Sequence, residues 1–339
     1  MAAPDRPFFL IGHPPLERSS RPTPARAARI LGLSIGVLTF LAGCSPSATT
    51  APLDFGDGAA TRFTGLAACS PDQPLVRQID PDLPLVLLVH GCYSSGGRFR
   101  ALADVFELHG QQTLCFNYDD RDSLHKSAEQ LRVGLRGLQR HMRNEDVTLV
   151  GHSQGGLIAR VALSGPTPLE QGDSSARYRL VTVSSPFAGI RAASDCGSLA
   201  MHILTLGISV GACQIVTGSD WNEIHPRADL VRDPAPLWPA VESHLAVVTD
   251  ERSACRRYAP AGECEKSDFV FDIEEQSNPR LLEDPRVKTI QIEAGHVEIV
   301  GESGIRPGKL VEALQHHEIL APTPPERRQA LLQLLRTLF

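Results

Sequence analysis

Several signatures of common functional classes are missing from this sequence. Basic residues are not in excess, because 39 Asp and Glu outnumber 33 Lys and Arg and the formal net charge is −6. That balance argues against nucleic acid as a partner and against electrostatic binding to anionic lipid headgroups. Neither a G-x-x-x-x-G-K-[ST] phosphate loop nor a G-x-G-x-x-G after a strand occurs, which disfavours a nucleotide-binding fold.

Long hydrophobic runs and metal-binding cysteine spacings are missing as well. The apolar run at residues 30–42 is too short to span a bilayer comfortably, and the stretch at residues 199–216 is broken by polar residues and glycines. The eight cysteines contain no C-x-x-C pair, so we expect no zinc or redox site and no bound metal.

The most informative feature present is the sequence Gly-His-Ser-Gln-Gly at residues 151–155. The preceding residues 147–150 predict a short buried strand and residues 157–163 predict a helix, so Ser153 occupies the turn between them. Gly151 and Gly155 are small enough to let strand and helix approach each other around a strained turn. This arrangement points a serine hydroxyl into a cleft, as nucleophilic catalysis requires.

A second glycine-rich loop follows the apolar residues 85–89, which also predict a strand. It begins His90-Gly91-Cys92. Acyl transfer builds negative charge on a carbonyl oxygen, and fixed main-chain N–H groups beside the nucleophile stabilise that charge. The main-chain amides of Cys92 and Gln154 are therefore our candidates for an oxyanion hole.

Together, H-G-x after one strand and G-H-S-Q-G-G after another resemble the lipase and esterase branch of the α/β-hydrolase superfamily, over roughly residues 83–301. The resemblance implies an α/β fold with a doubly wound, mostly parallel sheet flanked by helices, and a cap or lid insertion. Residues 184–189 resemble the T-P-H-x-G loop of lipases, with Phe187 in place of histidine. We expect Tyr93 and Phe187 to contact substrate.

A catalytic histidine follows the serine and the acid in chain order in this fold, close after the last strand. Residues 287–292 predict a late strand, and His296 lies in the loop just beyond it. We expect His90 and His152 to pack beside the site. His316 and His317 lie in a polar stretch and are expected at the solvated surface.

Two aspartates compete for the role of the acid that orients His296. Asp250 ends the predicted strand at residues 245–249, whereas the residues around Asp268 resemble the family's acid loop, displaced by an inserted loop between Cys255 and Cys264. We favour Asp268, with Asp250 as the alternative and Asp272 and Glu274 as lesser possibilities.

The amino terminus has the features of an export signal. Basic residues precede the apolar run, which ends in Leu-Ala-Gly-Cys at Cys44. This ending resembles the lipobox of bacterial lipoproteins and implies cleavage after residue 43, a lipid anchor on Cys44 and membrane attachment, with Ser45 typical of outer-membrane sorting. A plain buried helix is the competing interpretation. Residues 44–75 are then a tether and N-terminal extension, and residues 76–339 the hydrolase domain.

An exported chain would let the remaining cysteines pair in an oxidising compartment. We expect Cys255 to pair with Cys264 and Cys196 with Cys213.

Residues 190–243 interrupt the strand and helix pattern and are expected to form a lid or acyl-pocket cap, or alternatively helices that only complete the core. The sequence carries no signal for an oligomeric state.

These features predict a serine carboxylic ester hydrolase that acts on acyl-ester or lipid substrates. Ser153 would attack the ester, His296 would take its proton and an aspartate would fix the imidazole, so no cofactor is needed. An acyltransferase or thioesterase would share every one of these residues. The same fold could also belong to a peptidase or amidase of this superfamily, or to a non-catalytic lipoprotein that binds ligands.

Overall fold

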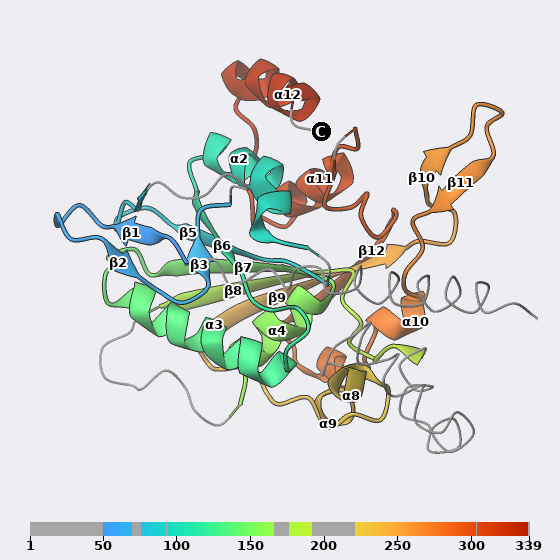
Figure 1. The fold of residues 1–339 in the computed structure, drawn as a ribbon, viewed down its shortest axis with the longest axis horizontal. Coiled ribbons are helices and arrows are strands. Elements are labelled where there is room, and N and C mark those ends of the chain that lie inside the picture. The colour runs from blue at the N-terminus through green and yellow to red at the C-terminus, as the bar shows by residue number, and fades with distance from the viewer. Residues whose placement is uncertain are drawn as a thin grey trace, which may run out of the picture. The chain divides into compact units, whose positions relative to one another are not determined.

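The apolar segments of the sequence form the strands of one central sheet. The computed structural model describes residues 50–69, 76–92, 94–165, 176–191, 221–302 and 304–337. Seven strands lie in the order β12–β9–β8–β7–β5–β6–β3 (Figure 1). Their bounds are β3 Leu66–Ala67, β5 Leu85–Val89, β6 Gln112–Phe116, β7 Asp146–His152, β8 Arg177–Val183, β9 Val241–Asp250 and β12 Val287–Glu293.

The strands of this sheet are parallel except β3, which pairs with β6 antiparallel. Parallel strands end at the same edge of a sheet, so the residues that follow β5, β7, β8, β9 and β12 come together there. From the adjacent strands β5 and β7, the order runs outward to β6 on one side and to β12 on the other. Ligands of doubly wound sheets bind where the order reverses in this way.

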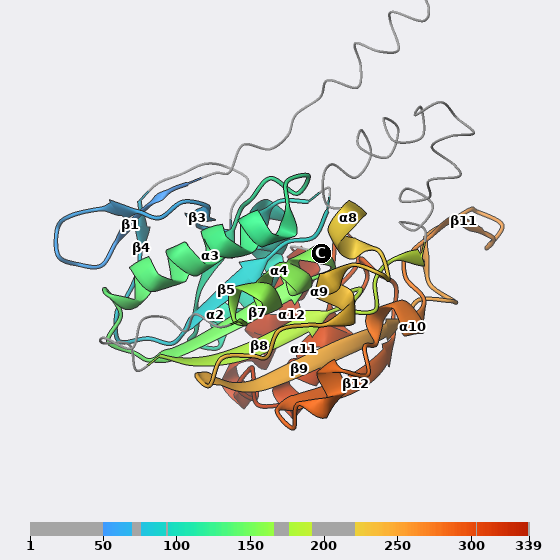
Figure 2. The same cartoon turned by 90° about the horizontal axis from the view of Figure 1, so that it is seen from below.

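Helices cover both faces of the sheet (Figures 1 and 2). On one face lie α3 (Leu124–Gln139) and α4 (Gln154–Ala162), and on the other lie α2 (Arg100–Leu108) and α11 (Gly308–His316). Each face has its own cluster of buried apolar side chains. The arrangement confirms the predicted α/β fold class with a doubly wound, mostly parallel sheet.

The α3 helix shows why sequence periodicity identified these elements. Its apolar residues recur every three or four positions, so they form one stripe that packs into the core. Ser123 begins the helix by accepting a hydrogen bond from the Lys126 main-chain N–H. The stripe consists of Leu124, Ala128, Leu131, Leu135 and Leu138, all of them buried.

Shorter elements surround this framework. A small sheet pairs β2, β1 and β4, and β10 with β11 forms a separate hairpin (Figure 1). None of the helices in the described ranges is long and apolar enough to cross a membrane. The remaining bounds are β1 Pro52–Asp54, β2 Thr61–Arg62, β4 Arg77–Gln78, β10 Cys255–Tyr258, β11 Cys264–Ser267, η1 Gly96–Phe99, α8 Trp221–Ile224, α9 Asp229–Arg232, α10 Ile273–Gln276, η2 Leu281–Glu283, η3 Pro325–Arg327 and α12 Arg328–Thr337.

Two disulfides join parts of the chain that the structure describes. Cys255 and Cys264 close the β10–β11 hairpin, which confirms the expected pairing. Cys69 and Cys115 form a second bond that the sequence spacing did not indicate; it ties the segment after β3 to β6. Other expectations lie outside the described residues: the leader at residues 1–43, Cys44, Tyr93, Cys196 and Cys213.

The interrupted segment at residues 190–243 is described only in part. Its last residues belong to the core rather than to a cap, because Leu237 and Trp238 are 4% and 2% exposed and β9 already begins at Val241. The expected boundary of the cap is therefore wrong at its carboxyl end. Within the expected tether and N-terminal extension at residues 44–75, β3 is part of the central sheet.

Candidate active site

Ser153 occupies the sharp turn between β7 and α4, as the sequence predicts. Its backbone is at φ 56° and ψ −128°, a region that side-chain-bearing residues rarely adopt. A Cβ at Gly155 would lie 2.3 Å from the carbonyl oxygens of Val89 and His90, and one at Gly151 would lie 2.5 Å from the Gly155 carbonyl oxygen. Only glycine fits at either position, so both residues hold the serine at the tip of a strained turn.

Ser153 and His296 line the same cavity, of about 80 Å³, at the carboxyl ends of β5 and β7. Each of the two residues is 7% exposed. The His-Gly loop after β5 approaches Ser153 closely, because a Cβ at Gly91 would lie 2.8 Å from the Ser153 Cβ. The other lining residues are Gly91, Cys92, Ser94, Arg98, Phe99, His152, Val297, Val300 and Gly301.

His296 lies in the loop after β12, where the sequence placed it. Within the described residues, no hydrogen bond joins the Ser153 hydroxyl to the His296 ring. Catalytic hydrogen bonds are often long before substrate binds, so this separation leaves the pair able to meet in a complex. Polar groups from the ends of two other strands contact the ring nitrogen Nδ1.

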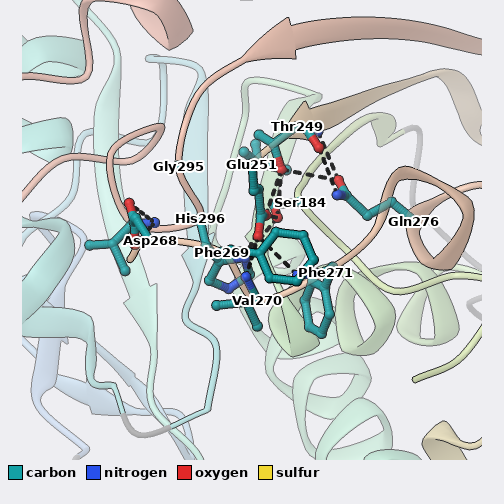
Figure 3. A network of polar contacts seen from close by, with 12 residues as sticks. Ser184, Thr249, Glu251, Asp268, Phe269, Val270, Phe271, Gln276, Gly295 and His296 are labelled. Atoms are coloured by element: carbon teal, nitrogen blue, oxygen red, sulfur yellow. Dashed lines mark hydrogen bonds and ion pairs between the residues drawn. The ribbon is translucent and has the colours of Figure 1, made fainter. Parts of the chain in front are cut away.

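The carboxylate at His296 Nδ1 belongs to Glu251. Its Oε1 atom lies 3.0 Å from Nδ1, and the Ser184 Oγ atom lies 2.8 Å from the same nitrogen (Figure 3). Glu251 directly follows β9 and Ser184 directly follows β8. The parallel sheet therefore brings both residues to the edge where Ser153 lies.

Glu251 is 1% exposed, and both of its carboxylate oxygens accept hydrogen bonds. Oε1 also lies 2.7 Å from the Ser184 Oγ and 2.8 Å from the Thr249 Oγ1, while Oε2 accepts from the main-chain N–H groups of Val270 at 2.6 Å and Phe271 at 2.9 Å. Burial by itself raises the pKa of the Glu251 carboxyl. The hydrogen bond and charge of His296, with the other donors, outweigh burial and hold that pKa below its usual value.

Asp268, the favoured acid of the sequence analysis, is not in contact with the imidazole. Its carboxylate accepts hydrogen bonds from the main-chain N–H groups of Val297 at 3.1 Å and Glu298 at 2.9 Å, apart from the cluster around Glu251 (Figure 3). The expected contact is therefore wrong. The β10–β11 hairpin carries Asp268 to the far side of the histidine loop, where burial raises the pKa of its carboxyl.

The other expected acids also lie elsewhere. Asp250 points away from its neighbour Glu251 and binds the exposed side chain of Arg252, which lowers the pKa of the Asp250 carboxyl. Asp272 begins α10 as its N-cap and contacts Arg191 at 2.7 Å. Glu274 lies 3.8 Å from the same guanidinium and is largely exposed. None of these three carboxylates approaches the His296 ring in the described structure.

The two histidines expected beside the site do pack there, and both are buried. His152 Nε2 lies 2.9 Å from the His296 main-chain oxygen, and burial lowers the pKa of His152 to about 3. His152 is therefore neutral and donates this hydrogen bond, which fixes the backbone of His296. His90 stacks on Tyr118, and burial lowers the pKa of His90 to about 4.

The two expected oxyanion donors lie in neighbouring segments. Cys92 lines the Ser153 cavity, and its Sγ atom contacts the side-chain oxygen of Gln154. Gln154 is the first residue of α4 and is 3% exposed. The loop after β5 and the start of α4 are thus joined beside the serine.

Phe187 lies apart from the Ser153 cavity. Its side chain is 7% exposed, packs against His244 with ring centroids 5.8 Å apart, and lines a second cavity. The turn after β8 directs Phe187 into the core on the α4 side, so it does not line the Ser153 cavity, and its expected contact with substrate stays a prediction.

Glu251, Ser184 and Thr249 are the residues of this cluster that the sequence analysis missed. The sequence placed Glu251 only two residues beyond the predicted strand at residues 245–249, next to Asp250. The observed strand β9 continues through Asp250, so Glu251 is the first residue after it, as Ser153 is after β7. A strand alternates its side chains between two faces, so adjacent Asp250 and Glu251 point in opposite directions. Which of the two meets the histidine depends on the packing around them, not on their spacing.

The described residues contain no group of three or more His, Cys, Asp or Glu side chains arranged to hold a metal ion. The groups that the strand ends bring together are a serine hydroxyl and an imidazole in one cavity, with a buried carboxylate behind the imidazole. These are the parts that nucleophilic acyl transfer requires.

Comparison with known proteins gives only distant likenesses. No protein-family model and no curated protein matches the sequence. The fold is similar to the mature lipase BlEst2 of Bacillus licheniformis (15% identity, TM-score 0.48, 75% of this chain and 98% of that one). It is also similar to propionate-bound esterase 2 of Thermogutta terrifontis (13%, 0.45, 83% and 98%) and to a putative cell surface hydrolase of Lactobacillus plantarum WCFS1 (16%, 0.41, 75% and 98%).

Proposed function

We propose that this protein is a serine carboxylic ester hydrolase whose catalytic residues are Ser153, His296 and Glu251. The observation that carries the proposal is the buried Glu251 carboxylate at 3.0 Å from His296 Nδ1, in a site whose cavity is also lined by a serine at φ 56°. A buried carboxylate is costly unless hydrogen bonds compensate for its loss of water. The Glu251 carboxylate lies behind an imidazole that shares a cavity with a strained serine. A role in orienting His296 for catalysis would explain why a carboxylate is buried at this position.

In the first step, His296 acts as a general base. The Glu251 carboxylate accepts a hydrogen bond from the Nδ1–H group and so leaves Nε2 as the basic nitrogen. Nε2 takes the Ser153 proton while Oγ forms a bond to the ester carbonyl carbon. Glu251 stabilises the imidazolium that results. The imidazolium then gives its proton to the departing alcohol, and the acyl group stays on Ser153.

The carbonyl oxygen becomes negatively charged in this step. The main-chain amides of Cys92 and Gln154 are the proposed donors, since the two residues contact each other beside Ser153. In the second step His296 removes a proton from water while the water oxygen bonds to the acyl carbon. His296 then returns that proton to the Ser153 Oγ as the bond between Oγ and the acyl carbon breaks, which releases a carboxylic acid and free Ser153. Every proton moves through His296, so no cofactor is needed.

The experiment is hydrolysis of p-nitrophenyl esters of graded chain length by the full chain and by Ser153→Ala. We expect the substitution to lower kcat by at least about 10⁴-fold while the circular dichroism spectrum stays unchanged. The chain-length optimum distinguishes esterase from lipase. No turnover of any ester by a folded wild type would contradict the proposal and favour an acyltransferase or a binding protein, and amide turnover at comparable rates would favour a peptidase.

We also propose that the protein is exported as a bacterial lipoprotein anchored through Cys44. The Cys69–Cys115 and Cys255–Cys264 disulfides support export, because such bonds persist in oxidising compartments. Cells that express the full chain should incorporate labelled palmitate into it, and Cys44→Ser should abolish the label. A wild-type chain without label would contradict the anchor but leave the ester hydrolase proposal intact.

A further inference from the structure

A second cavity lies on the α4 side of the sheet, with a volume of about 370 Å³. Its wall includes Arg160, which α4 carries two turns after Ser153. Only 5% of the Arg160 surface is exposed. The two cavities share no lining residue, so this one is separate from the proposed catalytic site.

The described protein does not satisfy the Arg160 guanidinium. Its Nε atom is buried and has no hydrogen-bond partner, and the guanidinium forms no ion pair within the described residues. The charge of Asp284 stabilises the Arg160 cation from a distance, but the Asp284 oxygens bind Arg286 at 2.6 and 2.9 Å. Burial accordingly lowers the pKa of Arg160 to about 10, so it remains a cation at neutral pH. A buried cation without a partner is costly, and an anion in the cavity would remove that cost.

The rest of the wall indicates what kind of anion fits. Most of it is apolar, and its apolar residues include Leu157, Val161, Phe187, Leu230 and Leu281. Asp229 and Asp233 also line the cavity and are exposed, and the Asp233 side chain is 85% exposed. Two carboxylates of this kind repel a multiply charged anion more strongly than a singly charged one.

We propose that this cavity binds a small organic carboxylate. The carboxylate would accept two parallel hydrogen bonds from the Arg160 guanidinium, a geometry for which arginine is suited, and the apolar body would lie against Leu157, Phe187 and Leu281. The Arg160 guanidinium matches a single negative charge, and the apolar side chains of the wall match an apolar body. Inorganic phosphate offers no apolar surface and carries more charge, which Asp229 and Asp233 would repel.

This proposal stands apart from the ester hydrolase proposal, because the ligand is a carboxylate and no bond in it changes. The test uses the full chain with Ser153→Ala, so that hydrolysis plays no part. Benzoate is the probe, benzamide is its uncharged counterpart of nearly the same shape, and phosphate is the inorganic anion. Binding is measured by isothermal titration calorimetry.

We expect benzoate to bind, and benzamide and phosphate to bind at least tenfold more weakly. Arg160→Met should weaken benzoate binding by about tenfold or more, since hydrogen bonds to a charged group are lost. Arg140→Met is the matched control: Arg140 is exposed, lies outside the cavity and carries the same charge, so its loss should leave benzoate affinity unchanged.

Thermal unfolding of the same variants separates a ligand site from a structural arginine. Without benzoate, Arg160→Met should be as stable as the parent or more stable, because the buried guanidinium lacks a protein partner. With benzoate, only the parent and Arg140→Met should gain stability. Equal benzoate affinity in Arg160→Met, no benzoate binding to the parent, or preferred binding of phosphate would each overturn the proposal.

Discussion

Glu251 is the residue on which the proposed chemistry depends most. Two main-chain N–H groups occupy its Oε2 atom, which leaves Oε1 directed at His296 Nδ1. The carboxylate cannot rotate away without losing these bonds. Because the pKa of Glu251 is lowered, the group stays ionised at neutral pH and selects the imidazole tautomer with a basic Nε2.

The Glu251→Gln substitution therefore tests whether Glu251 is the carboxylate that orients His296. The amide keeps the shape of the side chain but removes its charge, and it can present an N–H to Nδ1, which favours the wrong tautomer. We expect kcat for p-nitrophenyl esters to fall by about 10³- to 10⁴-fold with little change in KM. Steady-state kinetics of the full chain measures both parameters.

Asp250→Asn is the matched control, since it changes the adjacent carboxylate, which binds only the exposed Arg252 at the surface. We expect it to retain wild-type kcat within a factor of about two. If Asp250→Asn were the more damaging substitution, the assignment of Glu251 as the acid would be wrong.

Among the elements, the loop after β12 needs its own support because it carries His296. Asp268 supplies it by accepting hydrogen bonds from two consecutive main-chain N–H groups of this loop. Gly295 lets the carboxylate come close, since a Cβ there would lie 2.1 Å from the Asp268 Oδ2 atom. Asp268 is thus a positioning residue that acts through the backbone rather than through the imidazole.

Gly295→Ala should displace the Asp268 carboxylate and loosen this loop. We expect kcat to fall by roughly tenfold or more and the free energy of unfolding to fall by about 1–3 kcal/mol, as for other overpacked sites. Gly308→Ala is the control, because a Cβ at Gly308 meets nothing within 4 Å. In the double variant with Asp268→Asn the two losses should not add; fully additive losses would show that the residues act independently.

The elements themselves were largely predictable, and the acid was not. Strands such as β5 and β7 are continuous apolar runs, and the glycines around Ser153 are a local requirement of one turn. The choice of Glu251 over Asp268 depends on where the β10–β11 hairpin places residues distant in sequence. The Cys69–Cys115 bond likewise depends on β3 joining the sheet edge beside β6. Such contacts leave no periodic pattern in the sequence.

At the scale of the whole molecule, three buried histidines couple folding to pH. Burial lowers the pKa of His90 to about 4, and those of His152 and His244 to about 3, from 6.5. The unfolded chain therefore binds more protons than the folded chain in the window below pH 6.5. The free energy of unfolding falls as the pH falls through that window. Glu251 adds to this loss at lower pH, while Asp268, whose pKa is raised, opposes it.

We expect each of these histidines to remove about 2 kcal/mol of stability between pH 7 and pH 5, at about 1.4 kcal/mol per pH unit below 6.5. His244→Gln, which cannot titrate, should reduce the pH dependence of urea unfolding by about a third. His316→Gln is the control, because His316 is exposed and should leave the dependence unchanged. An unchanged dependence in His244→Gln would show that this histidine is not held neutral in the folded protein.

The central claim is that Ser153 is a nucleophile activated within this fold, and covalent labelling tests it most directly. The full chain is treated with a fluorophosphonate, and the modified residue is identified by mass spectrometry of its peptides. We predict one adduct, on Ser153, that is absent in Ser153→Ala and forms much more slowly in Glu251→Gln. A folded wild type that stays unlabelled, or that carries the adduct on another residue, would contradict the account.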